Sequence, residues 1–133
     1  MRTIKLLLLT IIFLTPSTFL MSQEQNKQFG IPDKMPLFDG ASSDLESQQK
    51  IASYFKEKGN QEVVDSDGLV YIRFVVDSTG TAVDPVILKS AGSELDQFAI
   101  NYVNEMPQWL PGLKDGNKVG VQFNVPVRFK IEK

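Results

Sequence analysis

Apolar and polar residues alternate without exception near the C-terminal end of the chain. The apolar positions are Val119, Val121, Phe123, Val125, Val127, Phe129 and Ile131. The positions between them are Lys118, Gly120, Gln122, Asn124, Pro126, Arg128 and Lys130. A period of two is typical of a strand with one buried face and one solvated face. The pattern predicts a strand from Lys118 to Lys130, at a sheet edge because Pro126 cannot donate a backbone hydrogen bond.

A β-hairpin is predicted further upstream. Residues 68–76 are rich in β-branched and aromatic side chains, which is typical of a largely buried strand. Residues 77–80 offer a tight turn with glycine, so residues 81–90 are expected to pair back onto the first strand. The Asp84-Pro85 step places this second strand at an edge or gives it a bulge.

Two segments have the spacing of amphipathic helices. The first is expected to begin at Ser43 or Asp44 and to run to about Lys58, where Gly59 would end it. Its apolar stripe would consist of Leu45, Ile51, Ala52 and Phe55, with Tyr54 beside it. The second is expected from residue 93 to 106 and would end before a proline. Its apolar positions all fall on one helical face and are Leu95, Phe98, Ala99, Tyr102, Val103 and Met106.

The order of these elements is helix, strand, strand, helix, strand, which predicts an α+β domain. We expect a three-stranded antiparallel sheet with the helices packed on one face. If both proline-bearing strands are edges, the strand order is 2-1-3. The single Trp109 follows the second helix and lies between two prolines. Two interpretations remain open, namely a cover over the end of the small core and a binding aromatic.

Residues 1–22 have the order of a secretory signal peptide, with basic residues, then an apolar run, then a small polar stretch ending at Ser22. The alternative is an uncleaved membrane anchor, which Pro16 would interrupt. Both interpretations place the folded part outside the cytoplasm, with membrane contact only through this segment. Residues 23–34 are expected to form a flexible lead-in, and residues 35–133 the domain.

Composition narrows the possible chemistry. The chain contains no Cys and no His, which excludes disulfides, Cys-based zinc sites, Ser-His-Asp triads and His-ligated metals made by the chain alone. The net charge is -2, and without a Lys/Arg cluster nucleic acid is not an expected partner. The acids fall in turns and at helix starts, so neither catalytic residues nor a metal or cofactor are predicted. A non-enzymatic protein is expected.

The bases on the solvated side of the last strand have two interpretations. These bases are Lys118, Arg128 and Lys130. Charges on an open edge prevent unwanted pairing with other chains. They also suit the flanks of a groove in which a peptide strand adds to the sheet by main-chain hydrogen bonds. The two roles are compatible.

Five short motifs occur in order along the chain. They are G-x-V-x-x-x-F-x-V-D-x-x-G at 68–80, L-D-x-x-A at 95–99, M-P-x-W-x-P-G at 106–112, G-x-x-V at 116–119 and P-V-x-F at 126–129. In these motifs and their spacing, over about half its length, the chain resembles the TonB C-terminal domain family. The M-P-x-W-x-P-G segment is the most specific of them.

The resemblance implies a periplasmic module that binds protein. Its last strand would add to an extended segment at the N-terminus of an outer-membrane TonB-dependent transporter. Carried over by position, the peptide-binding edge would consist of Lys118, Gly120, Gln122, Asn124 and Arg128. The structural signature would consist of Pro107, Trp109, Pro111 and Gly112.

Two departures from the family pattern bear on the expected role. The sequence lacks the long Pro-rich spacer of family energy transducers, and its apolar N-terminal segment lacks the family's His. These departures favour a free-standing periplasmic binding domain over an energy transducer. The alternative partner is another envelope protein, with the chain as a structural or regulatory subunit of an envelope complex.

Overall fold

The computed structural model describes residues 31–131 of the chain. The expected signal segment, residues 1–22, and the expected lead-in up to residue 30 lie outside the described residues. The elements in chain order are β1 (Leu37–Phe38), α3 (Asp44–Gln61), β2 (Gly68–Val76), β3 (Ala82–Lys89), α4 (Ser93–Asn104), β4 (Trp109–Leu110), β5 (Gly112–Lys114), β6 (Asn117–Val119) and β7 (Val121–Phe129). The α+β class is confirmed, because two helices accompany antiparallel sheets within these residues.

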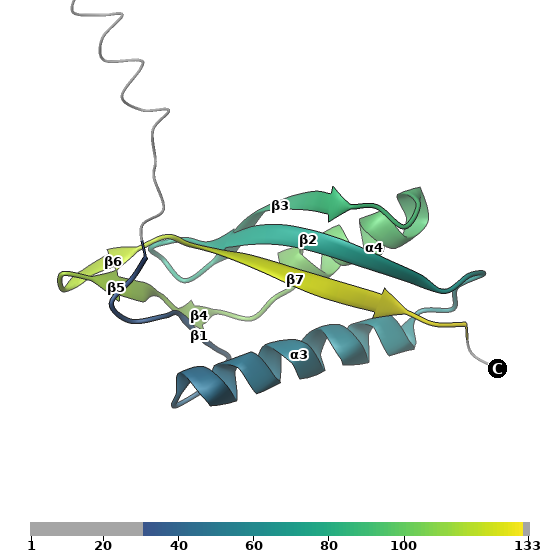
Figure 1. Cartoon of the computed structure of the whole chain (residues 1–133). Coiled ribbons are helices and arrows are strands. Elements are labelled where there is room, and N and C mark those ends of the chain that lie inside the picture. Colours follow the sequence, from purple (N-terminus) through teal and green to yellow (C-terminus); the bar gives the residue numbers. More distant parts are fainter. Residues whose placement is uncertain (1–30, 132–133) are drawn as a thin grey trace, which may run out of the picture.

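A three-stranded antiparallel sheet forms the centre of the fold, with β2 between β3 and β7 (Figure 1). The β2–β7 pairing is regular from Gly68 opposite Phe129 to Val76 opposite Val121. The β2–β3 pairing contains two irregularities, and Asp84 next to Pro85 has a positive φ of 55°. A bulge beside proline is what an edge strand accommodates.

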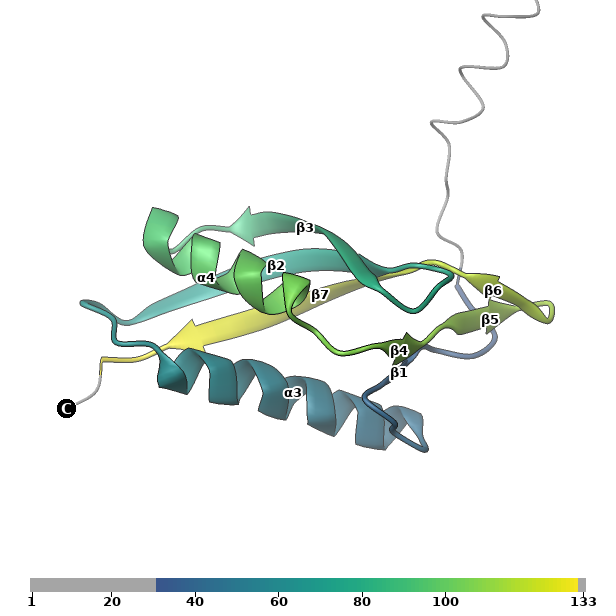
Figure 2. The same ribbon diagram turned by 180° about the vertical axis from the view of Figure 1, so that it is seen from behind.

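Both helices contribute to one hydrophobic core. In Figure 2, α4 crosses in front of β2 and β3, and α3 runs along β7. The core face of β2 is fully buried and consists of Val70, Ile72, Phe74 and Val76. The other face of the sheet carries exposed side chains such as Tyr71. The even-numbered residues of β2 thus face the core and Tyr71 faces away from it, because successive side chains of a strand point to opposite faces.

The helix α3 differs from the prediction at its C-terminal end and along its buried stripe. Ser43 is the N-cap, and its Oγ accepts a hydrogen bond from the Glu46 N–H at 3.2 Å. The expected end at Gly59 is wrong, because the helix continues to Gln61. Leu45 and Ala52 were expected to be buried but are exposed. The buried residues follow a spacing of four and are Ser47, Ile51, Phe55 and Gly59.

The buried stripe differs from the predicted one because it includes the polar residue Ser47. Its Oγ accepts the Phe38 N–H at 2.9 Å, which joins α3 to β1. A buried hydroxyl that is hydrogen-bonded in this way carries little energetic penalty. A polar residue therefore lies on the core side of α3, and Leu45 is left on the solvent side with 66% of its surface exposed.

Two small sheets were not predicted. The strand β1 pairs with β4, which sets Phe38 opposite Trp109. The strands β5 and β6 form a hairpin whose turn residues, Asp115 and Gly116, both have positive φ. The prediction of one continuous strand from Lys118 to Lys130 is therefore wrong at its start, because Gly120 separates β6 from β7.

The first residues that the structure describes lie beside β5. Asp33 and Lys34, from the end of the expected lead-in, both donate their N–H groups to the Leu113 carbonyl, at 2.8 and 3.1 Å. Leu113 in turn donates to the Lys34 carbonyl at 3.0 Å. These bonds tie residues 33 and 34 to β5. None of the helices within residues 31–131 combines the length and apolar character needed to span a membrane.

Two tyrosines join the C-terminal halves of α3 and α4. The Tyr102 hydroxyl donates to Glu62 Oε1 at 3.0 Å and to the Lys58 carbonyl at 3.2 Å. The Tyr54 hydroxyl donates to the Tyr102 carbonyl at 2.6 Å. Burial raises the pKa of Tyr54 to about 12, and burial together with the Glu62 carboxylate raises the pKa of Tyr102.

These shifts predict a loss of stability at alkaline pH. The folded state favours the neutral phenols, so their contribution is complete below the unfolded pKa of about 10 and is lost as pH rises beyond it. Replacing Tyr102 by Phe should therefore lower the free energy of unfolding at neutral pH. It should also make that free energy fall less steeply as pH rises above about 10. Urea titrations followed by circular dichroism across this pH range measure both effects, and a variant as steeply pH-dependent as the parent would contradict the assignment.

Candidate functional site

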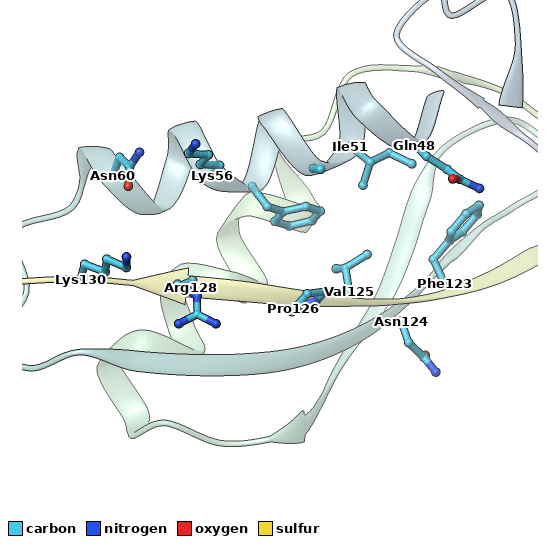
Figure 3. A pocket seen from close by; sticks show the side chains of 12 residues that line it. Gln48, Ile51, Lys56, Asn60, Phe123, Asn124, Val125, Pro126, Arg128 and Lys130 are labelled. Carbon is cyan, nitrogen blue, oxygen red and sulfur yellow. The ribbon is translucent and has the colours of Figure 1, made fainter. Parts of the chain in front are cut away.

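A groove of about 650 Å³ runs between α3 and the outer side of β7 (Figure 3). In this view Ile51 from α3 and Val125 from β7 point toward each other across the groove. The helix contributes Gln48, Ile51, Ala52, Phe55, Lys56 and Asn60, and the strand side contributes Phe123, Asn124, Val125, Pro126, Arg128 and Lys130. The volume is within the usual range of ligand-binding clefts in proteins.

The floor of the groove is continuous with the hydrophobic core. Ile51, Phe55 and Val125 are at most 9% exposed, and Phe123 is partly buried. The Phe123 ring stacks on Phe74 with a centroid separation of 5.6 Å and lies 5.1 Å from the Trp109 ring. Close packing of this kind keeps side chains in fixed rotamers. The floor is therefore an apolar surface whose shape is set by the core.

One edge of β7 is unpaired within the described part of the chain, because β7 has β2 as its only neighbour in the sheet. In an antiparallel pair, alternate residues direct both N–H and C=O either to the partner or away from it. The Arg128 carbonyl faces α3, since a Cβ on Gly59 would lie 2.5 Å from its oxygen. The regular β2–β7 register extends this orientation to Gln122, Asn124 and Pro126. Their backbone groups point away from β2 toward the groove side.

The rim of the groove is positively charged. Lys56, Arg128 and Lys130 line it, and none of the acidic residues within 31–131 does. The two ion pairs found among residues 31–131 involve Lys50 and Lys58, so the rim bases are not neutralised by ion pairs there. The potential along the groove therefore favours an acidic occupant over a basic one.

The structure separates the five residues expected at the peptide-binding edge. Gln122, Asn124 and Arg128 lie on β7 with exposed side chains, as the alternation predicted. Lys118 lies instead in β6, opposite Leu113, and Gly120 lies between β6 and β7. Because Lys118 pairs within the β5–β6 hairpin and the strand is interrupted at Gly120, these two N-terminal members of the predicted set do not lie on β7.

The expected signature residues lie around the end of the core. Trp109 is 2% exposed, and its ring lies 4.9 Å from that of Phe38. Its backbone N–H donates to the Gly80 carbonyl at 2.8 Å. This position corresponds to the interpretation of Trp109 as a cover over the core rather than a binding aromatic.

The remaining signature residues shape the path of the chain after α4. A Cβ on Gly112 would lie 2.9 Å from Val121 Cγ2 and 3.1 Å from the Lys34 carbonyl oxygen, so only glycine fits there without movement. Pro107 is exposed between α4 and β4, and Pro111 is partly buried between β4 and β5. Their fixed φ angles suit these short connections.

Several acids have structural partners. The Asp77 carboxylate accepts hydrogen bonds from the Thr79 hydroxyl and from the Thr79 and Thr81 N–H groups, which lowers the Asp77 pKa. Asp67 Oδ1 accepts the Ile131 N–H at 2.7 Å, and Asp96 Oδ1 accepts the Ala91 N–H at 3.0 Å. Within residues 31–131, no cluster of three or more acids could hold a metal ion. Asp77 and Asp96 thus stabilise local turns of the backbone, and Asp67 holds the segment that follows β7.

Sequence reasoning missed the contribution of α3 to the site. The groove-lining residues of α3 recur at a spacing of three or four residues and include polar side chains such as Gln48 and Asn60. The available signal was the spacing of four from Ser47 through Ile51 and Phe55 to Gly59. This signal is weak because a serine and a glycine take two of the four positions in the packed stripe.

No curated protein matches the chain in sequence. A family model described as the Gram-negative bacterial TonB protein C-terminal matches residues 63–131, just over half of the chain and the part from the start of β2 to the end of β7. The match implies a TonB-like protein-interaction module of the cell envelope, and the family is not known as one of enzymes. The chain belongs to the TonB C-terminal family.

Proposed function

We propose that the chain is a periplasmic protein-binding module whose strand β7 pairs with an extended segment of an outer-membrane TonB-dependent transporter. The observation that carries this proposal is the outer edge of β7, which has no strand partner among the described residues and lies beside an apolar groove. Family membership supports an envelope protein as the partner. The proposed mechanism is β-augmentation, in which the partner contributes one more strand to the sheet.

The groove has the features that such pairing requires. The outward backbone groups of Gln122 and Asn124 would supply hydrogen bonds to the incoming strand, and these bonds give affinity largely independent of sequence. Every second side chain of the incoming strand would face the surface formed by Ile51, Phe55 and Val125. Burial of apolar side chains there would stabilise the complex by about 25 cal/mol per Å² of area removed from water.

A proline at Asn124 tests the proposal. The Asn124 N–H points away from β2, so Asn124→Pro removes a donor from the outer edge without breaking a bond of the β2–β7 ladder. We expect the variant to remain folded and to bind a synthetic N-terminal peptide of a TonB-dependent transporter at least about tenfold more weakly, corresponding to about 1.4 kcal/mol. Isothermal calorimetry gives the affinity and circular dichroism the thermal midpoint.

The matched control is Asn124→Ala, which removes the same side chain but keeps the backbone donor. It should bind the peptide nearly as tightly as the parent protein. Equal losses in both variants would mean that the side chain, and not the edge, recognises the partner. If the parent binds no transporter peptide, the alternative of a structural or regulatory subunit in another envelope complex takes its place.

A further inference from the structure

The C-terminal turns of α3 close the groove at one end. Gly59 is buried, and a Cβ on it would lie 2.5 Å from the Arg128 carbonyl oxygen and 3.6 Å from the carbonyl carbon. The α3 backbone therefore lies directly against an outward backbone group of β7. An incoming strand cannot bond to the Arg128 carbonyl while α3 occupies this position.

Beyond this contact the chain that leaves β7 is held on the side of β2. The Ile131 N–H donates to Asp67, the residue before β2, at 2.7 Å. Before the contact, Pro126 lacks an N–H and can only accept. Apart from the Arg128 N–H, which lies next to the contact itself, the outward donors of β7 are therefore those of Gln122 and Asn124, both on the side of Pro126 away from Gly59.

We propose that α3 sets the register of the added strand. The contact between Gly59 and the Arg128 carbonyl is the stop, the point at which the added strand must end. This inference rests on the proposed function. A transporter segment would pair with residues 122–126 of β7 and would end where α3 meets Arg128. The ligand is thus a short extended segment, and its side chain next to Val125 faces Ile51 and is aliphatic.

The stop is built from a part of the chain outside the family match. The match begins at residue 63, after the end of α3 at Gln61. Phe123 and Gln48 line the end of the groove that lies away from Gly59 (Figure 3). The segment that matches the family model thus supplies the edge of β7. The helix α3, which precedes this segment, limits which residues of that edge can pair with an added strand.

Cysteine trapping tests the register, because the chain has no native Cys. Single variants Gln122→Cys, Asn124→Cys and Arg128→Cys place a thiol at exposed positions along one strand. Each full-length variant is incubated in a thiol–disulfide buffer with synthetic N-terminal peptides of a TonB-dependent transporter, each carrying one Cys at a different position. Mass spectrometry measures the adduct, normalised to the reaction of the same variant with glutathione, which corrects for the reactivity of each thiol.

We expect adducts at Gln122→Cys and Asn124→Cys, and a yield about tenfold lower at Arg128→Cys for every peptide, because a disulfide needs Cα atoms within about 7 Å. Adding Gly59→Ala to Arg128→Cys should raise that yield, because the new methyl group displaces the end of α3. The nearby change Glu57→Ala, at an exposed position of α3 outside the groove lining, is the control and should leave the pattern unchanged. Circular dichroism checks that each protein remains folded.

The outcomes separate the two proposals. Adducts of similar yield at all three positions would show that α3 is no stop, which overturns the register proposal and leaves the pairing at β7 intact. An Arg128→Cys yield that Gly59→Ala does not change in a folded protein would also overturn the role of Gly59. An absence of adducts above the glutathione background at every position would overturn both the pairing and the register.

Discussion

Replacing Trp109 by Ala is expected to lower the free energy of unfolding by about 3 to 5 kcal/mol, a large fraction of the total stability of a small domain. The Trp109 side chain is 2% exposed and lies among Phe38, Phe74 and Phe123, at centroid separations of 4.9, 6.0 and 5.1 Å. Its removal would leave a cavity where β1, β4 and the main sheet meet. Urea denaturation followed by circular dichroism measures the loss, because the variant has no Trp fluorescence.

The control for this change is Trp109→Phe. The Trp109 Nε1 is buried and has no hydrogen-bond partner within the described residues, so replacement by an apolar ring leaves no partner unsatisfied. We expect Trp109→Phe to cost clearly less than Trp109→Ala. An alanine variant with unchanged stability but lost peptide binding would instead make Trp109 a binding residue and reject its role in the core.

Introducing Asp at Val127 is expected to unfold the domain. Val127 is fully buried and lies opposite Val70 in the β2–β7 ladder. An unpaired carboxylate there costs several kcal/mol even when it takes up a proton, which is comparable with the total stability of about 5 to 15 kcal/mol. Loss of the cooperative thermal transition and of dispersed amide signals in NMR spectra would show the effect.

The matched control places the same residue on the other face of the same strand. Asn124→Asp introduces an identical carboxylate at an exposed position, where substitutions usually change stability by about 0.5 kcal/mol or less. The contrast between the two variants isolates burial from the intrinsic strand preference of Asp. Similar thermal midpoints for Val127→Asp and the parent protein would contradict the assignment of the core face of β7.

The placement of the candidate site was only partly predictable. The alternation around Val125 identified the edge strand and the exposed positions Gln122 and Asn124 before any tertiary information. Period two in a strand depends only on local backbone geometry, so it can be read directly from the chain. The wall of the groove opposite this strand depends on which side of α3 meets β7, and the weak apolar stripe of α3 gave too little signal to decide this.

The sequence by itself determined the elements whose signals are local. These are the β2–β3 hairpin, whose turn ends at Gly80, the amphipathic helix α4, and the two faces of β7. The α+β class also followed, because the order of helices and strands leaves few ways to bury their apolar faces. Membership of the TonB C-terminal family was likewise carried by short motifs in a fixed order.

Only the tertiary structure decided the features that join distant parts of the chain. Phe38 pairs with Trp109, and Gly59 lies inside α3 with the Arg128 backbone against it. The local preference of Gly for a helix end predicts the opposite, and it contains no information on contacts with residues far along the chain. The break at Gly120 arises in the same way, since pairing of β6 with β5 competes with continuation of β7. Such choices depend on packing free energies between segments, which the local pattern does not contain.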